Sequence, residues 1–489
     1  MKLLLILLNC LALGPTAFAQ PAAYDPAQRY SVAQMQADLA YVRGALEEAH
    51  PALYWYTPKD SLDRAFAQAA AALTHPLAEP EYWKILQTVV ARVHCGHTRV
   101  QHSAAYRAWF RRQPHPYLPF TVAVRQNRLF VAQNQSLAAE LRPGTEILAL
   151  DGHPTAEVLP RLRSLISADG YGTGFQDQEL EAGFFDSYYW SFYEAKAAYP
   201  LLVRDSTGQQ RLLTPLPRPA KPAAPASPAP AAAPLTAEQQ RARQLARLHT
   251  VRYPEGLPAT AILRIKEFSY DQLEDYKQFH RQLFADLAQR HVKQLVIDLR
   301  GNGGGNNLLS IDLCRYLLKH DFTVTKSALA PVLAPSFTQP DSTKAAYFDA
   351  THVKPLPDGT FAFTNSTVGV QHPYRDRYFR GNVVVLVDGG TFSAASNLAA
   401  SLRAQRRITV VGEETGGGEA GCSGGNISDL ELPQTHLALQ FPHFQLLTAC
   451  PHPQLGRGVR PDIEVVPTPW QVATHTDAVL PQLPALLAR

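Results

Sequence analysis

A serine at the break between a strand and a helix is the first candidate for chemistry in this chain. Five apolar residues, 383–387, predict a buried strand, which Asp388 and two glycines break before an Ala-rich run of helical spacing. Such a turn exposes a hydroxyl at the top of a sheet and aims helix N–H groups at a developing anion. Ser393 is therefore a candidate nucleophile, although the stretch taken alone favours an ordinary helix N-cap.

A glycine-rich segment follows a second buried strand. Residues 294–299 predict that strand, and Arg300-Gly-Asn-Gly-Gly-Gly-Asn306 comes directly after it, before a helix over 308–318. Glycines allow the backbone positive φ angles and a close approach to a ligand. A flexible connector is the other interpretation, but α/β folds place their sites at strand-to-helix turns. The segment lacks the spacing of a phosphate loop.

His97 lies at a predicted corner of the chain. Residues 81–93 predict a helix, Gly96 ends it, and residues 98–101 begin an extended piece. A histidine at such a corner can be held in one orientation, but the local pattern favours a packing or surface role. The neighbouring His94, on the helical side, suits a structural role better.

Taken together, four segments occur in an order that resembles the C-terminal processing (tail-specific) and tricorn-type serine peptidases. Cys95-Gly-His-Thr98 is also similar to the family's Asp-Gly-His-Thr segment, with cysteine in place of aspartate. The resemblance implies a serine endopeptidase that hydrolyses unfolded proteins or peptides through an acyl-enzyme, without a cofactor. The four segments are Asp298-Leu-Arg-Gly-Asn-Gly-Gly-Gly305, Asp388-Gly-Gly-Thr-Phe-Ser-Ala-Ala395, Gly412-Glu-Glu-Thr-Gly-Gly-Gly418 and Gly458-Val-Arg-Pro-Asp-Ile-Glu-Val465.

This resemblance assigns roles to individual residues. Ser393 would attack the peptide carbonyl, and the N–H of Ala394 would stabilise the oxyanion together with that of Gly303 or Gly304. Preorganised donors of this kind each lower the barrier by roughly 3–4 kcal/mol. The sequence does not distinguish between the two glycines.

The identity of the general base is predicted from the absence of a lysine after the serine. The processing branch of the family uses a lysine soon after the serine, but the last lysine here is Lys354. The tricorn-like branch uses an upstream histidine, whose place His97 matches, and a neutral imidazole can accept the serine proton near pH 7. That branch also has a glutamate before its Gly-Val-x-Pro-Asp segment, which is absent here. Glu413 and Glu414 are the substitutes considered for orienting His97.

Two other functions compete with the peptidase. The missing acid makes an inactive ligand- or peptide-binding protein on the same scaffold conceivable, because retinoid-binding relatives use this fold to hold apolar ligands. A crotonase-like acyl-CoA enzyme would share the core and the oxyanion hole, but an exported protein would not meet CoA. The intact serine, histidine and glycine segment favour the peptidase.

The fold class expected is α/β, with a crotonase/ClpP-like α/β core, a PDZ-like β-rich domain and a helical N-terminal domain. Strand–helix alternation indicates the core, and short strands around a Pro-Gly and an Asp-Gly turn indicate the β-rich unit. A Pro/Ala tract supplies a linker, since it cannot build a core. The expected ranges are 1–19 for a signal peptide, 20–112 helical, 117–214 PDZ-like, 215–240 linker and 245–489 core.

Composition places the protein outside the cytoplasm and away from nucleic acid. Lys2, an apolar run and Ala17-Phe18-Ala19 predict a cleaved secretory signal, so we expect a periplasmic or extracellular protein without an integral span. A net charge of +4 on 489 residues, without a basic stripe, argues against nucleic acid. Cys422 and Cys450, both expected in a loop-rich segment, are the favoured disulfide pair, and no spacing predicts a metal site.

Overall fold

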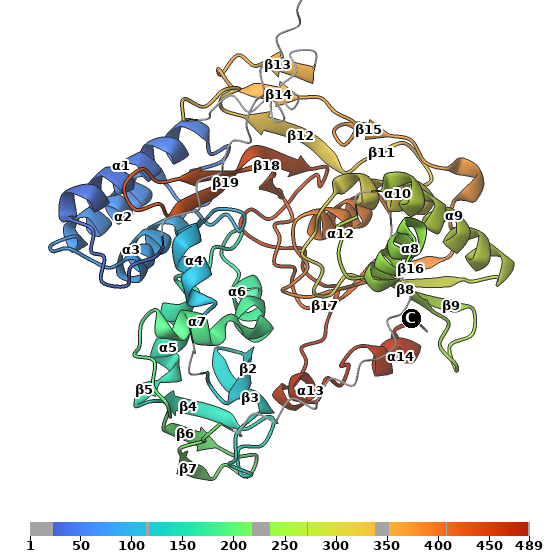
Figure 1. Cartoon of the computed structure of the whole chain (residues 1–489). Coiled ribbons are helices and arrows are strands. Elements are labelled where there is room, and N and C mark those ends of the chain that lie inside the picture. Colours follow the sequence, from blue (N-terminus) through green and yellow to red (C-terminus); the bar gives the residue numbers. More distant parts are fainter. Residues whose placement is uncertain are drawn as a thin grey trace, which may run out of the picture.

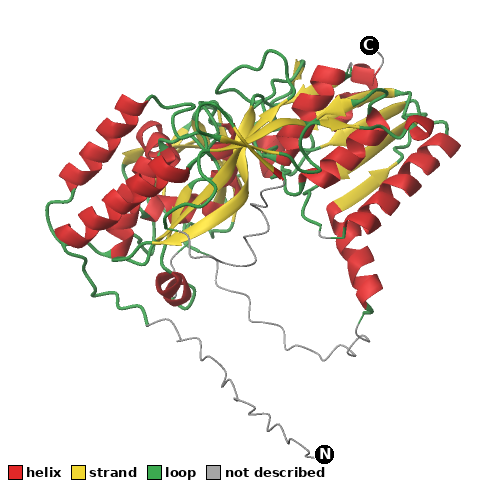
Figure 2. Ribbon diagram, turned by 90° about the horizontal axis from the view of Figure 1, so that it is seen from above, coloured by secondary structure: helices red, strands yellow, loops and turns green. Residues whose placement is uncertain are grey.

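The computed structural model describes residues 23–113, 117–217, 235–270, 272–337, 352–406 and 408–487. A group of N-terminal helices, a β-rich unit and an α/β part lie around a long hairpin of strands (Figure 1). Seen from above, the helices gather toward two ends of the molecule and strands run between them (Figure 2). The expected α/β class with a helical N-terminal region is confirmed.

The α/β part is built on one sheet with the strand order β20-β17-β16-β10-β9-β8. Its neighbouring strands are parallel, except that β8 and β9 are antiparallel. The central strands read as unbroken apolar runs because parallel strands are buried on both faces. The strands are β8 (His249–Arg252), β9 (Thr260–Ile265), β10 (Gln294–Asp298), β16 (Asn382–Val387), β17 (Thr409–Gly412) and β20 (Ile463–Glu464).

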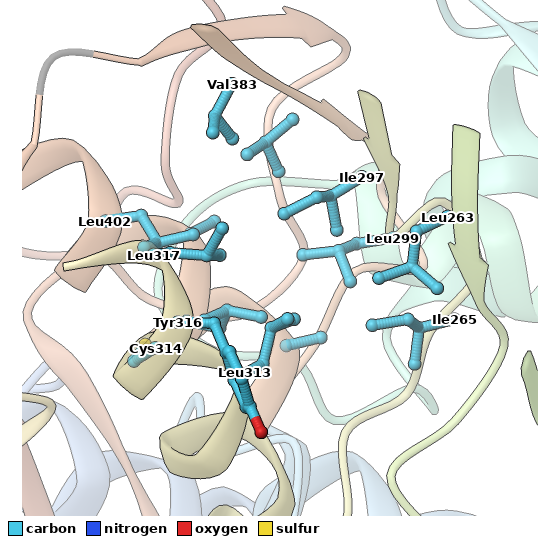
Figure 3. Packing of buried hydrophobic residues seen from close by; sticks show 14 of the residues in the cluster. Leu263, Ile265, Ile297, Leu299, Leu313, Cys314, Tyr316, Leu317, Val383 and Leu402 are labelled. Carbon is cyan, nitrogen blue, oxygen red and sulfur yellow. The ribbon is translucent and has the colours of Figure 1, made fainter. Parts of the chain in front are cut away.

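Alternate residues of these strands enter two apolar layers. Val383 packs with Ile297 and Leu402 against one set of helices, as Figure 3 shows, whereas Val384 and Leu386 face the C-terminal segments. Because β10 and β16 are neighbours with Asp298 opposite Leu386, the turns that follow both strands meet at one edge of the sheet. The helices are α8 (Ala237–Leu248), α9 (Leu273–Gln289), α10 (Asn307–Leu317), α12 (Ala394–Gln405), α13 (Pro469–Ala473), η5 (Leu480–Gln482) and α14 (Leu483–Leu487).

The N-terminal helices form a second core. Helix α1 begins at Ser31, whose hydroxyl accepts from the N–H of Gln34, while the Gln34 side chain accepts from the N–H of Ser31. Met35, Leu46 and Tyr82 are buried between these helices. The elements are α1 (Val32–Ala49), α2 (Lys59–Ala72), α3 (Glu79–Ala91), β1 (Arg99–Gln101) and α4 (Ala104–Phe110).

The β-rich unit closes around its own core, which includes Leu129, Ile147 and Leu201. Its strand order is β2-β3-β4-β6-β7, with β5 paired to β4. The aromatic segment 184–193 contains helix α7. The elements are β2 (Phe120–Arg125), β3 (Arg128–Asn134), β4 (Glu146–Leu150), β5 (His153–Pro154), α5 (Thr155–Arg163), α6 (Gly174–Glu179), η1 (Leu180–Phe184), α7 (Phe185–Trp190), β6 (Leu201–Arg204) and β7 (Gln210–Leu213).

The segment expected to be loop-rich is a long hairpin, and that expectation was wrong. Strands β18 (Gly421–Glu431) and β19 (Ala438–Thr448) pair antiparallel, and β19 also pairs with β1, with Arg99 opposite Gln440. The hairpin thus joins the helical part to the α/β part (Figure 1). The remaining elements are β11 (Phe322–Thr323), β12 (Thr325–Ala330), β13 (Val353–Pro355), β14 (Phe361–Phe363), β15 (Val370–Gln371) and η4 (Arg375–Arg377).

The expected disulfide is also wrong, because Cys422 is a buried residue of β18 and both it and Cys450 are free thiols. Cys95 and Cys314 are likewise free and buried. The signal segment 1–19 and most of the Pro/Ala tract lie outside the described residues. Among the helices that the structure describes, none has the length and apolarity required to cross a bilayer.

Candidate active site

Ser393 lies at the junction of strand β16 and helix α12, as the sequence predicts, in a strained conformation. Its φ and ψ angles are 50° and −123°, and it occupies the N-cap position of α12 without a side-chain capping bond. A positive φ at a residue other than glycine costs on the order of 1–3 kcal/mol and persists only where the surroundings impose it. The ordinary N-cap interpretation therefore fails, because the hydroxyl does not serve the helix.

The surroundings that impose this turn come from the glycine-rich segment. The carboxylate of Asp388 accepts from the N–H of Gly301 at 2.7 Å and from that of Gly390 at 2.9 Å. The hydroxyl of Thr391 donates to the carbonyl of Leu299 at 2.9 Å. One residue before the serine, the N–H of Phe392 donates to the carbonyl of Asn302 at 2.9 Å. The two turns are thus one rigid unit.

The structure distinguishes between the two glycines that the sequence left open. Gly304 has φ +98°, and a β-carbon there would lie 2.7 Å from Cβ of Ser393 and 2.8 Å from the nitrogen of Ala394. Its own N–H donates to the side-chain oxygen of Asn302 at 2.9 Å. Gly303 is exposed, and among the described residues no acceptor is found for its N–H. Gly304 therefore allows the glycine-rich segment to approach Ser393 closely, and Gly303 retains a backbone N–H without an acceptor among the described residues.

Ala394 supplies a second donor beside the serine. It is the first residue of α12, where backbone N–H groups have no carbonyl partner within the helix. The positive end of the helix dipole lies at the same place and favours a negative charge. Two donors and a helix terminus thus surround the Ser393 turn.

His97 reaches this turn from a part of the chain about 300 residues away. It precedes β1, whose pairing with β19 carries it to the α/β part. Its ring packs against that of Phe392, with the two centroids 4.9 Å apart. On the other side, a β-carbon on Gly424 of strand β18 would lie 3.8 Å from Cε1 of His97. The predicted histidine therefore packs against Phe392, the residue directly before Ser393.

Burial keeps this imidazole neutral. Desolvation lowers the pKa of His97 to about 4, and the positive charge of Arg99 acts in the same direction, while the backbone carbonyl of Ser423 opposes both. A pKa this low means that the ring is unprotonated and able to accept a proton at neutral pH.

The two glutamates considered as partners of His97 lie elsewhere. Glu414 pairs with the guanidinium of Arg457 and accepts from the N–H of Gly458 at 2.7 Å. Glu413 faces Arg125 and a group of acids, and burial raises its pKa to about 7. Neither carboxylate has a contact with the imidazole, so both substitutes are excluded.

A different acid, missed by the sequence analysis, lies beside His97. Asp169 is buried, and a ligand atom from each of Cys95, His97 and Asp169 lies within 4.8 Å of the other two. Its only signal in the sequence was an Asp-Gly pair, which by itself predicts a turn. Among the described residues this is the one group of three that could hold a metal ion, and a thiol, an imidazole and a carboxylate suit zinc.

Cys422 completes the surroundings of the serine. Its thiol is buried beside the side chains of Ser393 and Asn397 and lies near Asp169 and Cys95. Desolvation raises the pKa of Cys422 well above its usual value, so the group is a neutral thiol. It is therefore a packing partner and weak donor, and a poor nucleophile.

Comparison with known proteins agrees with this geometry. The sequence model described as "Peptidase family S41" matches residues 259–465. That range contains β10, the glycine-rich segment, the Ser393 turn and the whole β18–β19 hairpin. No curated protein matches the chain significantly.

Two solved structures of CPAF share the fold over almost the whole chain. Mature CPAF in complex with lactacystin aligns over 94% of this chain and 98% of its own, with 15% identity and a TM-score of 0.62. A serine-to-alanine mutant of CPAF aligns over 91% and 94%, with 15% identity and a TM-score of 0.61. The photosystem II D1 C-terminal processing protease aligns over 88% and 93%, with 14% identity and a TM-score of 0.40. At these identities the likeness to CPAF establishes the fold. Residues 259–465, which include the serine turn, are thus similar to peptidase family S41, and the chain is a serine peptidase.

Proposed function

We propose that this protein is an exported serine endopeptidase in which Ser393 is the nucleophile and His97 the general base. The observation that carries the proposal is the strained Ser393 turn, whose hydroxyl does not cap the helix and whose neighbour Phe392 packs on the His97 ring. Strain retained at a site that also gathers a base and anion donors is typical of a catalytic centre.

The first half of the reaction follows from these groups. Neutral His97 accepts the proton of the Ser393 hydroxyl as the serine oxygen attacks the peptide carbonyl carbon. The carbonyl oxygen becomes an anion, and the N–H groups of Gly303 and Ala394 are the donors proposed to stabilise it. The protonated imidazole then gives its proton to the leaving amine, and an acyl-enzyme remains.

Water completes the cycle by the same steps in reverse order. His97 accepts a proton from water, the hydroxide oxygen attacks the ester carbonyl, and the serine oxygen leaves with the proton held by the histidine. The residues named here need no cofactor for these steps. A lysine base of the processing branch is not available at the corresponding position, since the last lysine is Lys354.

Export and substrate choice are further parts of the proposal. The signal pattern at residues 1–19 supports a periplasmic or extracellular site of action. The β-rich unit supports a preference for extended, unfolded substrates, since such units add a peptide as an extra strand or hold a terminal carboxylate. Unfolded substrates with free and amidated C-termini distinguish these modes, because equal kcat/KM for the two would exclude carboxylate capture.

The decisive experiment is active-site labelling. A fluorophosphonate probe should label the wild-type protein at Ser393, and Ser393→Ala should abolish both labelling and peptide hydrolysis. The variant should keep the thermal midpoint within a few degrees, because the hydroxyl makes no structural capping bond. A wild-type protein that neither reacts with the probe nor cleaves unfolded substrates would favour the alternative of an inactive ligand- or peptide-binding protein.

A further inference from the structure

Two buried polar atoms without hydrogen-bond partners occur in one small cluster beside the proposed active site. They are Nδ1 of His97 and Oδ2 of Asp169, and both are shielded from water. The side chains that carry them lie within 4.8 Å of each other, measured between ligand atoms. An unpaired buried polar atom costs about 1–3 kcal/mol, so two of them on neighbouring side chains indicate a common function.

The other oxygen of Asp169 fixes its position relative to the histidine. Oδ1 accepts from the N–H of Gly96 at 2.8 Å, directly before His97 in the chain. Gly96 can have no side chain here, because a β-carbon would lie 2.5 Å from the Phe392 ring. The carboxylate is thus held by the backbone of the segment that carries the imidazole.

The segment after Asp169 is anchored on two sides. The N–H of Gly170 donates to the carbonyl of His94 at 3.2 Å, and the N–H of Tyr171 donates to that of Gly456 at 2.9 Å. The hydroxyl of Tyr171 donates to the carbonyl of Tyr56 at 2.8 Å. Gly170 has φ +67°, and a β-carbon there would lie 2.4 Å from the carbonyl oxygen of Gly456. The carboxylate is therefore preorganised.

We propose that Asp169 is the positioning residue for His97, accepting the Nδ1 proton and so leaving Nε2 free to take the proton of Ser393. This inference rests on the proposed peptidase function. Asp169 lies in the segment that follows helix α5 of the β-rich unit. It takes the role of the glutamate that this chain lacks before Gly458.

The physical reason is the choice of tautomer. A carboxylate at Nδ1 can only accept a hydrogen bond, so the ring proton stays on Nδ1 and the lone pair on Nε2. A protonated Asp169 would donate to Nδ1 and reverse the tautomer, leaving Nε2 as a donor that cannot act as base. Burial raises the pKa of Asp169 to about 7, although the N–H groups of Gly96 and Gly418 lower it. Activity should therefore rise as the pH passes about 7.

Other ionisable groups lie near Asp169 and His97, and their effects on activity have to be distinguished from the effect of these two residues. Cys95, Cys422 and Tyr56 lie near the Asp169 carboxylate, and burial keeps each of them neutral by raising its pKa. Arg99 is the cation whose charge acts on His97, and the carbonyl of Ser423 is the competing acceptor near its ring. The hydroxyl of Tyr56 is also buried without a partner. Tyr56→Phe therefore tests whether it contributes.

The test is Asp169→Asn, which keeps an oxygen for the N–H of Gly96 and replaces the free oxygen by an NH2 group. We expect kcat on an unfolded peptide to fall by about 10²- to 10⁴-fold with little change in KM, as loss of the orienting acid does in serine triads. The rise of activity near pH 7 should disappear. The added loss from Asp169→Asn in a His97→Ala background should be less than threefold, because the two residues act as a unit.

Two further variants keep the test independent of folding. Asp186→Asn is the matched control, since Asp186 is also a carboxylate with a pKa raised by burial that accepts a backbone N–H, from Leu118 at 3.0 Å. It should retain activity within twofold. Asp169→Ala should recover activity with added formate, because Asp169 lines a cavity of about 330 Å³ that the small carboxylate can enter.

The proposal has clear contrary outcomes. Asp169→Asn with near wild-type kcat and an unchanged pH profile, in a protein that fluorophosphonate still labels at Ser393, would overturn the role of Asp169 alone. Activity lost on dialysis against a chelator and restored by Zn²⁺ would show that the cluster holds a metal and would also overturn it. A wild-type protein without labelling would instead overturn the proposed function.

Discussion

At the scale of single residues, the site depends on backbone positions as much as on side chains. Ser393 and Gly304 both have positive φ, and they approach each other so closely that only glycine fits at 304. The chemistry therefore requires a glycine for a steric reason, in addition to the N–H groups that surround the serine.

A pair of glycine substitutions separates these roles. Gly304→Ala should lower the free energy of unfolding by about 1–3 kcal/mol and remove activity, because the new β-carbon meets Ser393 and φ is +98°. Gly303→Ala has open space within 4 Å, so its stability should stay within about 0.5 kcal/mol of wild type. Denaturant unfolding and peptide hydrolysis measure the two effects, and equal stability losses would refute the assignment of close approach to Gly304.

The ionisation of His97 can be observed directly. Since burial lowers its pKa to about 4, the ring should stay neutral at pH 5.5, where an ordinary histidine is mostly protonated. Histidine-selective isotope labelling with NMR detection, assigned through His97→Gln, measures the titration. A midpoint near 6.5 would mean that the ring is solvated in solution and that the buried geometry does not hold.

At the scale of elements, the hairpin β18–β19 holds His97, the proposed base, beside the turn that carries Ser393, the proposed nucleophile. Strand β19 pairs with β1 next to His97, and β18 passes the edge of the imidazole. Phe441 on β19 is fully buried in the cluster of the N-terminal helices, so the hairpin belongs to the core of the helical part as well.

This arrangement predicts that a core substitution in the hairpin lowers both the stability and the activity of the protein. Phe441→Ala should cost about 3–5 kcal/mol, because it leaves a cavity between hairpin and helices, and the surviving folded protein should have reduced kcat. Ile427→Ala on the paired strand is the control, since Ile427 is 37% exposed and should cost less than about 1 kcal/mol. Thermal unfolding and kinetics report both. A destabilised Phe441→Ala with unchanged kcat would show that the hairpin does not position His97.

At the scale of the whole molecule, buried carboxyl groups make stability depend on pH. Burial raises the pKa of Glu413 to about 7 even though Arg125 opposes it, and Asp388, Glu181 and Asp177 add to the increase. A folded pKa above the unfolded value means that the group stabilises the fold fully below about pH 4.5. That contribution is lost as the pH rises through about 7.

Replacing the group should therefore stabilise the protein only at higher pH. Glu413→Gln should raise the free energy of unfolding by about 1–2 kcal/mol at pH 8 relative to wild type, and the difference should vanish near pH 4. Activity should be unchanged, since Glu413 has no contact with His97. Urea unfolding at the two pH values provides the measurement, and a destabilised variant at pH 8 would indicate that the charged form is stabilised in the native state.

The sequence by itself determined the elements and the chemistry within each local segment. The apolar run at 383–387, the break before Ser393 and the glycines after residue 300 all follow from short-range patterns, so their strands, turns and helices were predictable. The family resemblance likewise identified Ser393 and His97 from the sequence. In the structure, the ring of His97 packs against Phe392, the residue before Ser393.

Which groups meet at the site depends on contacts between distant parts of the chain. The hairpin could not be predicted because its pairing with β1 joins residues more than 300 positions apart, and the glycines and polar residues of β18 look like a loop in isolation. Asp169 was missed for the same reason, as an Asp-Gly pair predicts a turn wherever it occurs. The proximity of Asp169 to His97 arises from long-range packing of three parts of the chain. Local propensity carries no information about such contacts, whereas the pairing of β1 with β19 and the anchoring of Tyr171 determine them.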